Sequence, residues 1–95
     1  LIALSRRNVI NARRKGLHHL AEPEKAILRR FINAESKTQA LPIGDGVVKG
    51  LRSARIMYRS SSVGEHNAVD RSSPLVDHDI HDWAWEYINK HPEIL

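Results

Sequence analysis

The chain has 95 residues and a mass of 10.8 kDa, which is enough for one small domain but not for two independent hydrophobic cores. Hydrophobic residues make up 41% of it and charged residues 27%, so the chain is too apolar for wholesale disorder. It contains no cysteine, which excludes a disulfide scaffold, a thiolate zinc site and a cysteine nucleophile and favours a cytosolic setting. No apolar run approaches the roughly 20 residues of a membrane span.

The net charge of +4 conceals an uneven distribution along the chain. Residues 1–60 carry 13 Lys and Arg and 4 acids, a balance of +9, whereas residues 61–95 carry 2 and 7, a balance of −5. Such a split is typical of a protein whose basic side meets an anionic partner. It is equally typical of two halves that attract each other, within the fold or in a homodimer, and both interpretations stay open.

Residues 1–20 favour a helix and contain no proline, so they predict a basic N-terminal helix. Gly16 is expected to weaken or end this helix. On a helical wheel, Arg6 and Arg13 fall within the narrow sector that carries the apolar residues of this helix. Burying that sector in a small core would therefore also bury two charged side chains. We therefore expect residues 1–17 to be a connector, a dimer arm or a juxtamembrane stalk, and residues 18–95 to form the compact domain.

The opening residues Leu1-Ile2-Ala3-Leu4 lack an initiator Met and look like the end of a removed membrane span, so we expect the chain to be a fragment of something longer. Basic residues concentrate on the cytoplasmic side of a span, where they favour anionic lipid headgroups. The candidates for such contacts are Arg6, Arg7, Arg13, Arg14 and Lys15.

Two apolar stripes predict short helices in the middle of the chain. The first helix spans residues 22–33, with Pro23 suited to its first turn and Phe31 in its buried stripe. A short extended piece follows over residues 38–43. The second helix spans residues 45–54, with Asp45 as its N-cap.

A hairpin and a last helix complete the predicted elements. Residues 56–59 read as a strand with Ile56 and Tyr58 on one face, and Ala68-Val69 is expected to return antiparallel to it. The last helix is predicted to start at Asp77 or Asp79 and to stop near His91, before Pro92. Its apolar face comprises Ile80, Trp83, Ala84, Tyr87 and Ile88.

Trp85 lies off that apolar face and is therefore a candidate interface anchor, unless the N-terminal helix covers it. Histidine and aspartate alternate over residues 77–82, but a helix start would leave at most His78 and Asp82 on one side. We therefore expect no metal. No nucleophile elbow, phosphate-binding loop or metalloprotease motif is present, so we also expect no catalytic residue, no cofactor and no enzyme activity.

The order of these elements is α+β, and two short helices followed by a hairpin is the layout of a winged-helix domain. In DNA-binding domains of that type, the helix before the wing enters the major groove. Candidate contacts to nucleic acid or another anion lie on the outer face of that helix and on the wing: Lys49, Arg52, Arg55 and Arg59. Only Ser53 is available there for base edges, so a merely solvated basic face is the favoured interpretation.

Residues 23–31 (PEKAILRRF), residues 41–51 (LPIGDGVVKGL) and Ile56 with serines 60–62 resemble the cytoplasmic part of superinfection exclusion protein B. The closing WAWEYI and HPEIL stretches are similar to variants of that family on phages, prophages and bacterial chromosomes. The resemblance covers residues 18–95. It implies N-terminal membrane spans, a small domain on the cytoplasmic face of the inner membrane, and a block to lytic development of an incoming phage. It implies no catalytic residue, and Ala21 replaces the usual Ser or Thr cap.

We therefore expect the cytoplasmic domain of a membrane-anchored superinfection exclusion protein that acts as a non-catalytic interaction module for an unidentified protein. The alternative is a nucleic-acid-binding winged helix-turn-helix domain of a phage or prophage regulator. In either case we expect one core made of Ile27, Leu28, Phe31, Val48, Leu51, Ile56, Trp83, Tyr87 and Ile88.

Overall fold

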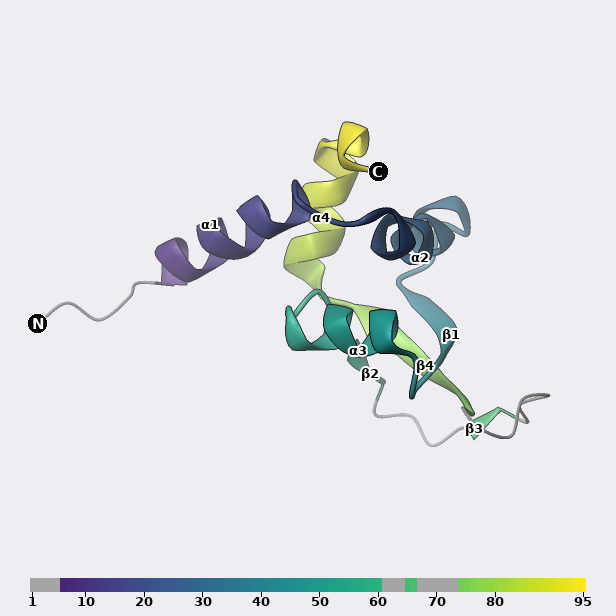
Figure 1. The fold of residues 1–95 in the computed structure, drawn as a ribbon. Coiled ribbons are helices and arrows are strands. Elements are labelled where there is room, and N and C mark those ends of the chain that lie inside the picture. The colour runs from purple at the N-terminus through teal and green to yellow at the C-terminus, as the bar shows by residue number, and fades with distance from the viewer. Residues whose placement is uncertain (1–5, 61–64, 67–73) are drawn as a thin grey trace, which may run out of the picture.

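A computed structural model describes residues 6–60, 65–66 and 74–95 of the chain. It confirms the expected α+β class and the basic helix at its start, whereas the winged-helix assignment stays a prediction. The elements follow in the order α1 (Arg6–Leu17), α2 (Glu22–Asn33), β1 (Thr38–Pro42), α3 (Gly46–Ser53), β2 (Met57–Arg59), β3 (Glu65–His66), β4 (Leu75–Ile80), α4 (Asp82–Lys90) and the 3-10 helix η1 (Pro92–Ile94) (Figure 1).

The strands form one antiparallel sheet with β4 in the middle. Its order is β1-β4-β2, and the two-residue strand β3 also pairs with β4. Met57 of β2 lies opposite Ile80, and Leu41 of β1 lies opposite Val76. The strand that pairs with β2 is therefore β4. The expected return strand, Ala68-Val69, lies outside the described residues.

The prediction for residues 75–80 was wrong. We expected the last helix to start at Asp77 or Asp79, but residues 75–80 form β4, and α4 begins only at Asp82. His81 stands at the N-cap position without a capping side-chain hydrogen bond. Ile80 is consequently a core residue of the sheet and not of the helix.

The core lies between one face of the sheet and helices α2, α3 and α4. The exposure of β4 alternates, with Val76, His78 and Ile80 buried. Six residues of the expected core are buried, namely Leu28, Phe31, Val48, Leu51, Ile56 and Ile88, while Ile27, Trp83 and Tyr87 are partly buried against it.

The expected facing of β2 was also wrong. Met57 is buried, whereas Tyr58 is 42% exposed on the outer face of the sheet. Ile56 is buried from its position just before the strand, where it follows α3. Because alternate strand residues face opposite sides, burial of Met57 places Tyr58 outside.

The two middle helices begin as their sequences indicate. The Asp45 carboxylate accepts hydrogen bonds from the backbone N–H groups of Val47 and Val48 at 2.9 and 3.1 Å, which confirms it as the N-cap of α3. Ala21 has no side-chain acceptor for α2, but Glu24 reaches back and accepts from the Ala21 N–H at 2.8 Å.

Helix α1 projects from the rest of the structure, as Figure 1 shows, and packs on α4 near its own C-terminal end. Leu17, its last residue, is fully buried in the core. Among the described residues, no helix has both the length and the apolar character that crossing a membrane requires.

Candidate functional site

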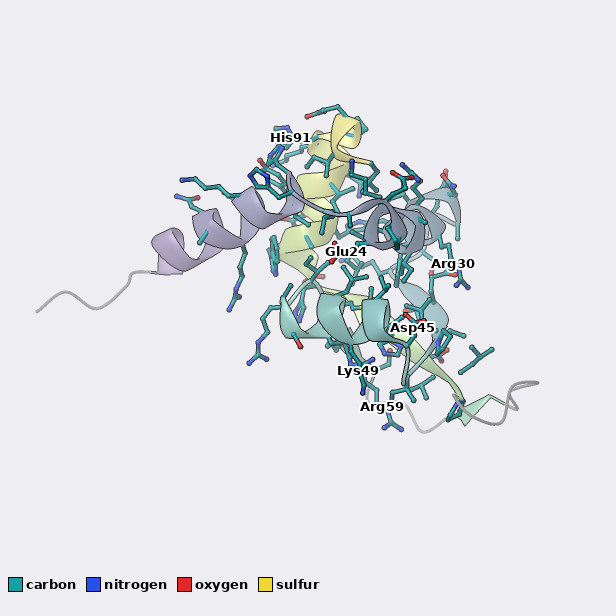
Figure 2. All side chains as sticks on the ribbon, in the orientation of Figure 1. Glu24, Arg30, Asp45, Lys49, Arg59 and His91 are labelled. Atoms are coloured by element: carbon teal, nitrogen blue, oxygen red, sulfur yellow. The ribbon has the colours of Figure 1, made fainter. Side chains whose placement is uncertain are left out.

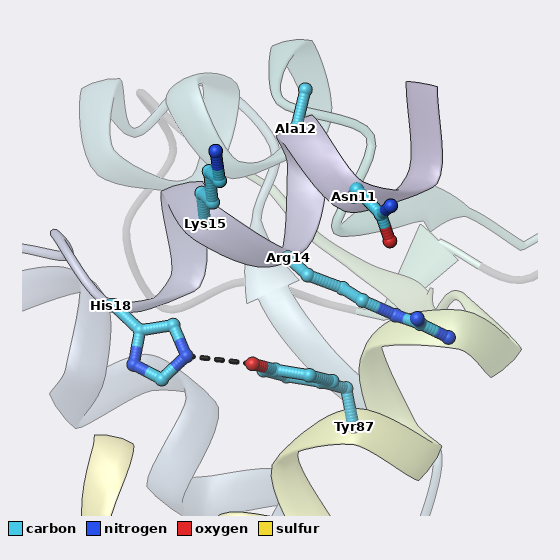
Figure 3. Close-up of a pocket in the computed structure, with 6 residues that line it drawn as sticks. All are labelled: Asn11, Ala12, Arg14, Lys15, His18 and Tyr87. Atoms are coloured by element: carbon cyan, nitrogen blue, oxygen red, sulfur yellow. Dashed lines mark hydrogen bonds between the residues drawn. The ribbon is translucent and has the colours of Figure 1, made fainter. Parts of the chain in front are cut away.

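A groove of about 640 Å³ lies between α1 and α4 (Figure 3). Its wall on α1 is formed by Asn11, Ala12, Arg14 and Lys15, with His18 just after the helix and Tyr87 of α4 opposite. Positions 11, 14, 15 and 18 share one side of a helix because they are three and four residues apart. The groove volume is in the range that small-molecule ligands occupy.

Tyr87 organises the groove. Its hydroxyl group lies 2.7 Å from Nε2 of His18, and the two rings meet edge to face with centroids 5.6 Å apart. The Arg14 guanidinium lies over the Tyr87 ring, with Cζ 5.5 Å from its centroid, which is cation–π geometry. Figure 3 shows the Arg14 side chain extended across this ring. His91 contacts Tyr87 as well, at 4.3 Å between centroids.

The groove is positively charged. Among residues 11–60 and 74–95, Arg29 pairs with Glu22, Lys37 pairs with Asp82, and His91 contacts Glu93, and none of these contacts involves Arg14 or Lys15. A cationic wall beside an aromatic ring, open to solvent, suits an anionic ligand. Arg14 and Lys15 were expected to be membrane-proximal. Arg13 lies near His81, whose pKa is lowered mainly by burial and secondly by the charge of Arg13. The side chains of Arg6 and Arg7 lie outside the described residues.

Arg52 does not point outward with Lys49, as the helical spacing suggested. One of its guanidinium nitrogens lies 2.9 Å from Nε2 of the fully buried His78, and another donates to the Ile43 carbonyl at 2.9 Å. His78 Nδ1 lies 2.7 Å from the Val76 carbonyl, which assigns the imidazole proton to Nδ1 and leaves Nε2 to accept from Arg52. Burial, followed by the charges of Arg52 and Arg59, lowers the pKa of His78.

The other basic candidates on this side are exposed. Lys49 and Arg59 extend from α3 and β2 into solvent (Figure 2). Arg55 lies beyond the end of α3, and its backbone carbonyl accepts a hydrogen bond from the Trp83 indole at 3.0 Å. The structure therefore separates Arg52 from Lys49, Arg55 and Arg59, so the four do not form one solvent-facing patch.

Trp85 is partly buried against the core, and its role as an interface anchor stays a prediction. Ala84 and Ile88 are the buried residues of α4 and face the core. The two tryptophans lie on either side of these residues around the helix. The core-facing side of α4 is therefore wider than the expected apolar face, because it also includes Trp85.

A polar network on the outer face of the sheet was missed at the sequence level. Asp79 accepts hydrogen bonds from the hydroxyl groups of Thr38 at 2.6 Å, Ser60 at 2.8 Å and Tyr58 at 3.3 Å. Partial burial opposes ionisation, but the three donors together lower the pKa of Asp79. The Tyr58 ring also contacts His81, with centroids 4.6 Å apart. The assignment of residues 77–82 to a helix start concealed this cluster.

The alternation of histidine and aspartate does not build a metal site within the part of the chain that the structure describes. No three His, Asp or Glu side chains there are grouped as ligands. His78 faces the core, Asp79 faces outward, and Asp82 is paired with Lys37 at 2.6 Å.

The chain matches a protein-family model described as super-infection exclusion protein B. The match spans residues 2–92, which include α1, the groove and the sheet. Searches of curated proteins and of solved structures gave no significant match.

Proposed function

Because the chain belongs to the super-infection exclusion protein B family, we propose that it is the cytoplasmic part of a membrane-anchored protein that excludes superinfecting phage. It acts at the cytoplasmic face of the inner membrane as a non-catalytic module that contacts another protein. The observation that carries this proposal is the projection of the basic helix α1 from the α+β body (Figure 1).

Helix α1 has the properties of a stalk that leads from a membrane surface to the body. It joins the core through Leu17 at its end, and its last turn holds Arg14 and Lys15. Near an anionic membrane surface each such charge contributes about 1 kcal/mol of attraction. Helices α2 to α4 and the sheet then face the cytoplasm, where a partner can reach them.

The surface that we propose for the protein partner is the outer face of the sheet around Tyr58. Tyr58 is the exposed large hydrophobic residue of the described chain, at 42% exposure. Its ring is held by His81 and its hydroxyl group by Asp79, so little conformational freedom is lost when a partner covers it. Tyrosine is also enriched among the residues that dominate binding at protein interfaces.

The test is a plating assay in which the intact protein carries Tyr58→Ala. A hot-spot loss of about 2 kcal/mol weakens partner binding roughly thirtyfold, so we expect exclusion to collapse at unchanged protein level. Tyr58→Phe is the matched control, because it keeps the ring and removes only the contact to Asp79, and we expect it to retain most exclusion. Full exclusion by Tyr58→Ala would contradict the interaction surface.

Nucleic-acid binding is the second candidate, because Lys49 and Arg59 remain exposed and unpaired with any acid in the described residues. Arg52 is committed to His78, which leaves a weaker phosphate-binding face than the sequence indicated. A gel shift on duplex DNA across a salt series decides between the two. A salt-dependent shift that Lys49→Glu with Arg59→Glu abolishes would favour this candidate over the interaction module.

A further inference from the structure

Arg14 is poised for an anion. Its guanidinium carbon lies 5.5 Å from the centroid of the Tyr87 ring, and no ion pair or hydrogen bond joins it to a carboxylate or carbonyl group of the described residues. A cation–π contact uses none of the guanidinium N–H groups, so they stay available to an acceptor. These N–H groups match two oxygens of a phosphate, and a side chain already held against a ring loses less freedom when it binds.

The pair formed by His18 and Tyr87 adds a neutral donor to the same groove. Their 2.7 Å contact is one hydrogen bond, so it uses only one of the two protons carried by the neutral imidazole and the hydroxyl group. If the Tyr87 hydroxyl donates to Nε2, the neutral imidazole keeps its own N–H on Nδ1. If Nε2–H donates instead, the Tyr87 hydroxyl keeps its proton. In both tautomers one donor is left over for an acceptor.

The remaining charges of the groove also favour an anion. Lys15 lines it beside Arg14, while Glu93 is not part of the groove lining and lies 3.3 Å from Nδ1 of His91. The last carbonyl groups of α1 carry partial negative charge, and the basic residues of that turn offset it.

We propose that the α1–α4 groove binds the phosphate of an anionic lipid headgroup, with Arg14 as the principal ligand and Lys15, His18 and Tyr87 in support. This inference rests on the proposed function, because a stalk-like α1 brings the groove to the membrane surface. The lipid phosphate is favoured over a soluble phosphate ester because that surface presents such phosphates continuously beside the helix.

Binding to vesicles tests the proposal with the chain as it is. We expect cosedimentation with vesicles that contain phosphatidylglycerol and not with vesicles of phosphatidylcholine alone. Arg14→Lys keeps the charge but loses the bidentate fork and the fit to the ring, so we expect at least tenfold weaker binding. Lys25→Arg, a charge-conserving change on α2 outside the groove lining, serves as the control, with binding within about twofold of the parent chain.

Tyr87→Phe separates the ring from the hydroxyl group. It keeps the aromatic floor under Arg14 and removes the contact to His18, so we expect a loss smaller than that of Arg14→Lys. Circular dichroism melts check that each variant is folded. Arg14 is exposed, so its replacement leaves the core intact.

Equal binding by Arg14→Lys and the parent chain would overturn the groove as a site, because diffuse charge would then suffice. Competition by soluble glycerol 3-phosphate at the concentration of the lipid phosphate would overturn the lipid as the ligand. Neither result touches the proposed function, which fails separately if the intact protein fractionates away from membranes or if Tyr58→Ala excludes phage fully.

Discussion

His78 is a fully buried, uncharged imidazole inside an otherwise apolar sheet face. It is tolerated because both ring nitrogens have partners, the Val76 carbonyl for Nδ1 and Arg52 for Nε2. A second proton would have to sit on Nε2, opposite the Arg52 guanidinium. Burial and this opposing charge therefore keep the neutral form.

The burial of neutral His78 makes the stability of the fold depend on pH. The folded-state pKa of His78 is lowered, so below about pH 6.5 the unfolded chain binds a proton that the folded chain does not. The free energy of unfolding should fall as the pH drops from 7.5 to 5.5, by up to about 1.4 kcal/mol per unit for each such group. His81, whose pKa is also lowered, acts in the same direction. Urea denaturation at a series of pH values measures this dependence.

His78→Gln identifies the group responsible. Glutamine supplies a donor and an acceptor but does not titrate, so we expect a shallower slope between pH 7.5 and 5.5. Lys49→Gln, a change on the exposed side of α3, should leave the slope unchanged. An identical slope in His78→Gln and the parent chain would show that other histidines govern the effect.

At the scale of elements, α2 and α3 end in the same way, with a left-handed residue that is not glycine. Glu35 has φ 52° and Arg55 has φ 62°. The following residue in each case bonds back to the helix, Ser36 N–H to the Phe31 carbonyl and Ile56 N–H to the Leu51 carbonyl, both at 3.1 Å. This is the Schellman arrangement, which glycine adopts most readily.

Arg55→Gly should therefore stabilise the protein. Relief of the left-handed strain raises the free energy of unfolding by about 1–2 kcal/mol. The greater conformational freedom of glycine in the unfolded chain offsets part of this increase. We expect a net gain of about 0.5–1 kcal/mol in denaturant melts, since the Arg55 carbonyl that binds Trp83 is retained. Arg55→Ala keeps the strain, so a comparable gain there would contradict the explanation.

The elements that sequence reasoning located correctly depend on local signals. Pro23 and Glu24 mark the start of α2, and Asp45 marks that of α3 through bonds within three residues. Strand β4 depends instead on distant partners, β1 and β2, and its alternation is complete only if His78 counts as a buried residue. The acidic residues around it matched a helix start equally well, which explains the error.

The groove could not be predicted from the sequence for the same physical reason, because it depends on residues that are far apart in the chain. Arg14 and Lys15 were singled out by charge, but the aromatic partner that orients Arg14 is Tyr87, far along the chain. Periodicity placed Tyr87 on the buried stripe of the last helix and carried no information on what would cover it. Only the packing of α1 on α4 brings the two together.

At the scale of the whole molecule, the basic and acidic halves are joined weakly. Among the side chains of residues 11–60 and 74–95, the ion pair between Lys37 and Asp82 links residues 1–60 to residues 61–95, and both side chains are exposed. Exposed pairs contribute little to stability. The two halves are held by the shared core and not by their opposite charges, which leaves the charge of α1 available for a partner outside the fold.

This arrangement predicts that α1 is separable from the body. A fragment that begins at Leu17 keeps the residue that reaches the core and also His18, which contacts Tyr87. It loses the Arg14 contact, worth about 0.5–1 kcal/mol at an exposed site. We expect this fragment to fold with a similar unfolding transition, measured by circular dichroism.

Trypsin provides the complementary measurement on the full chain. Cleavage after Arg6, Arg7, Arg13 or Arg14 should precede cleavage after Arg29, whose guanidinium donates to the Leu95 carbonyl at 2.6 and 3.0 Å and to Glu22 at 2.6 Å. A helix attached mainly by its last turn opens locally at low cost, whereas α2 opens only with the core. If the α1 sites resist as long as Arg29, or if the shortened fragment unfolds, α1 is part of the folding unit and cannot serve as a stalk.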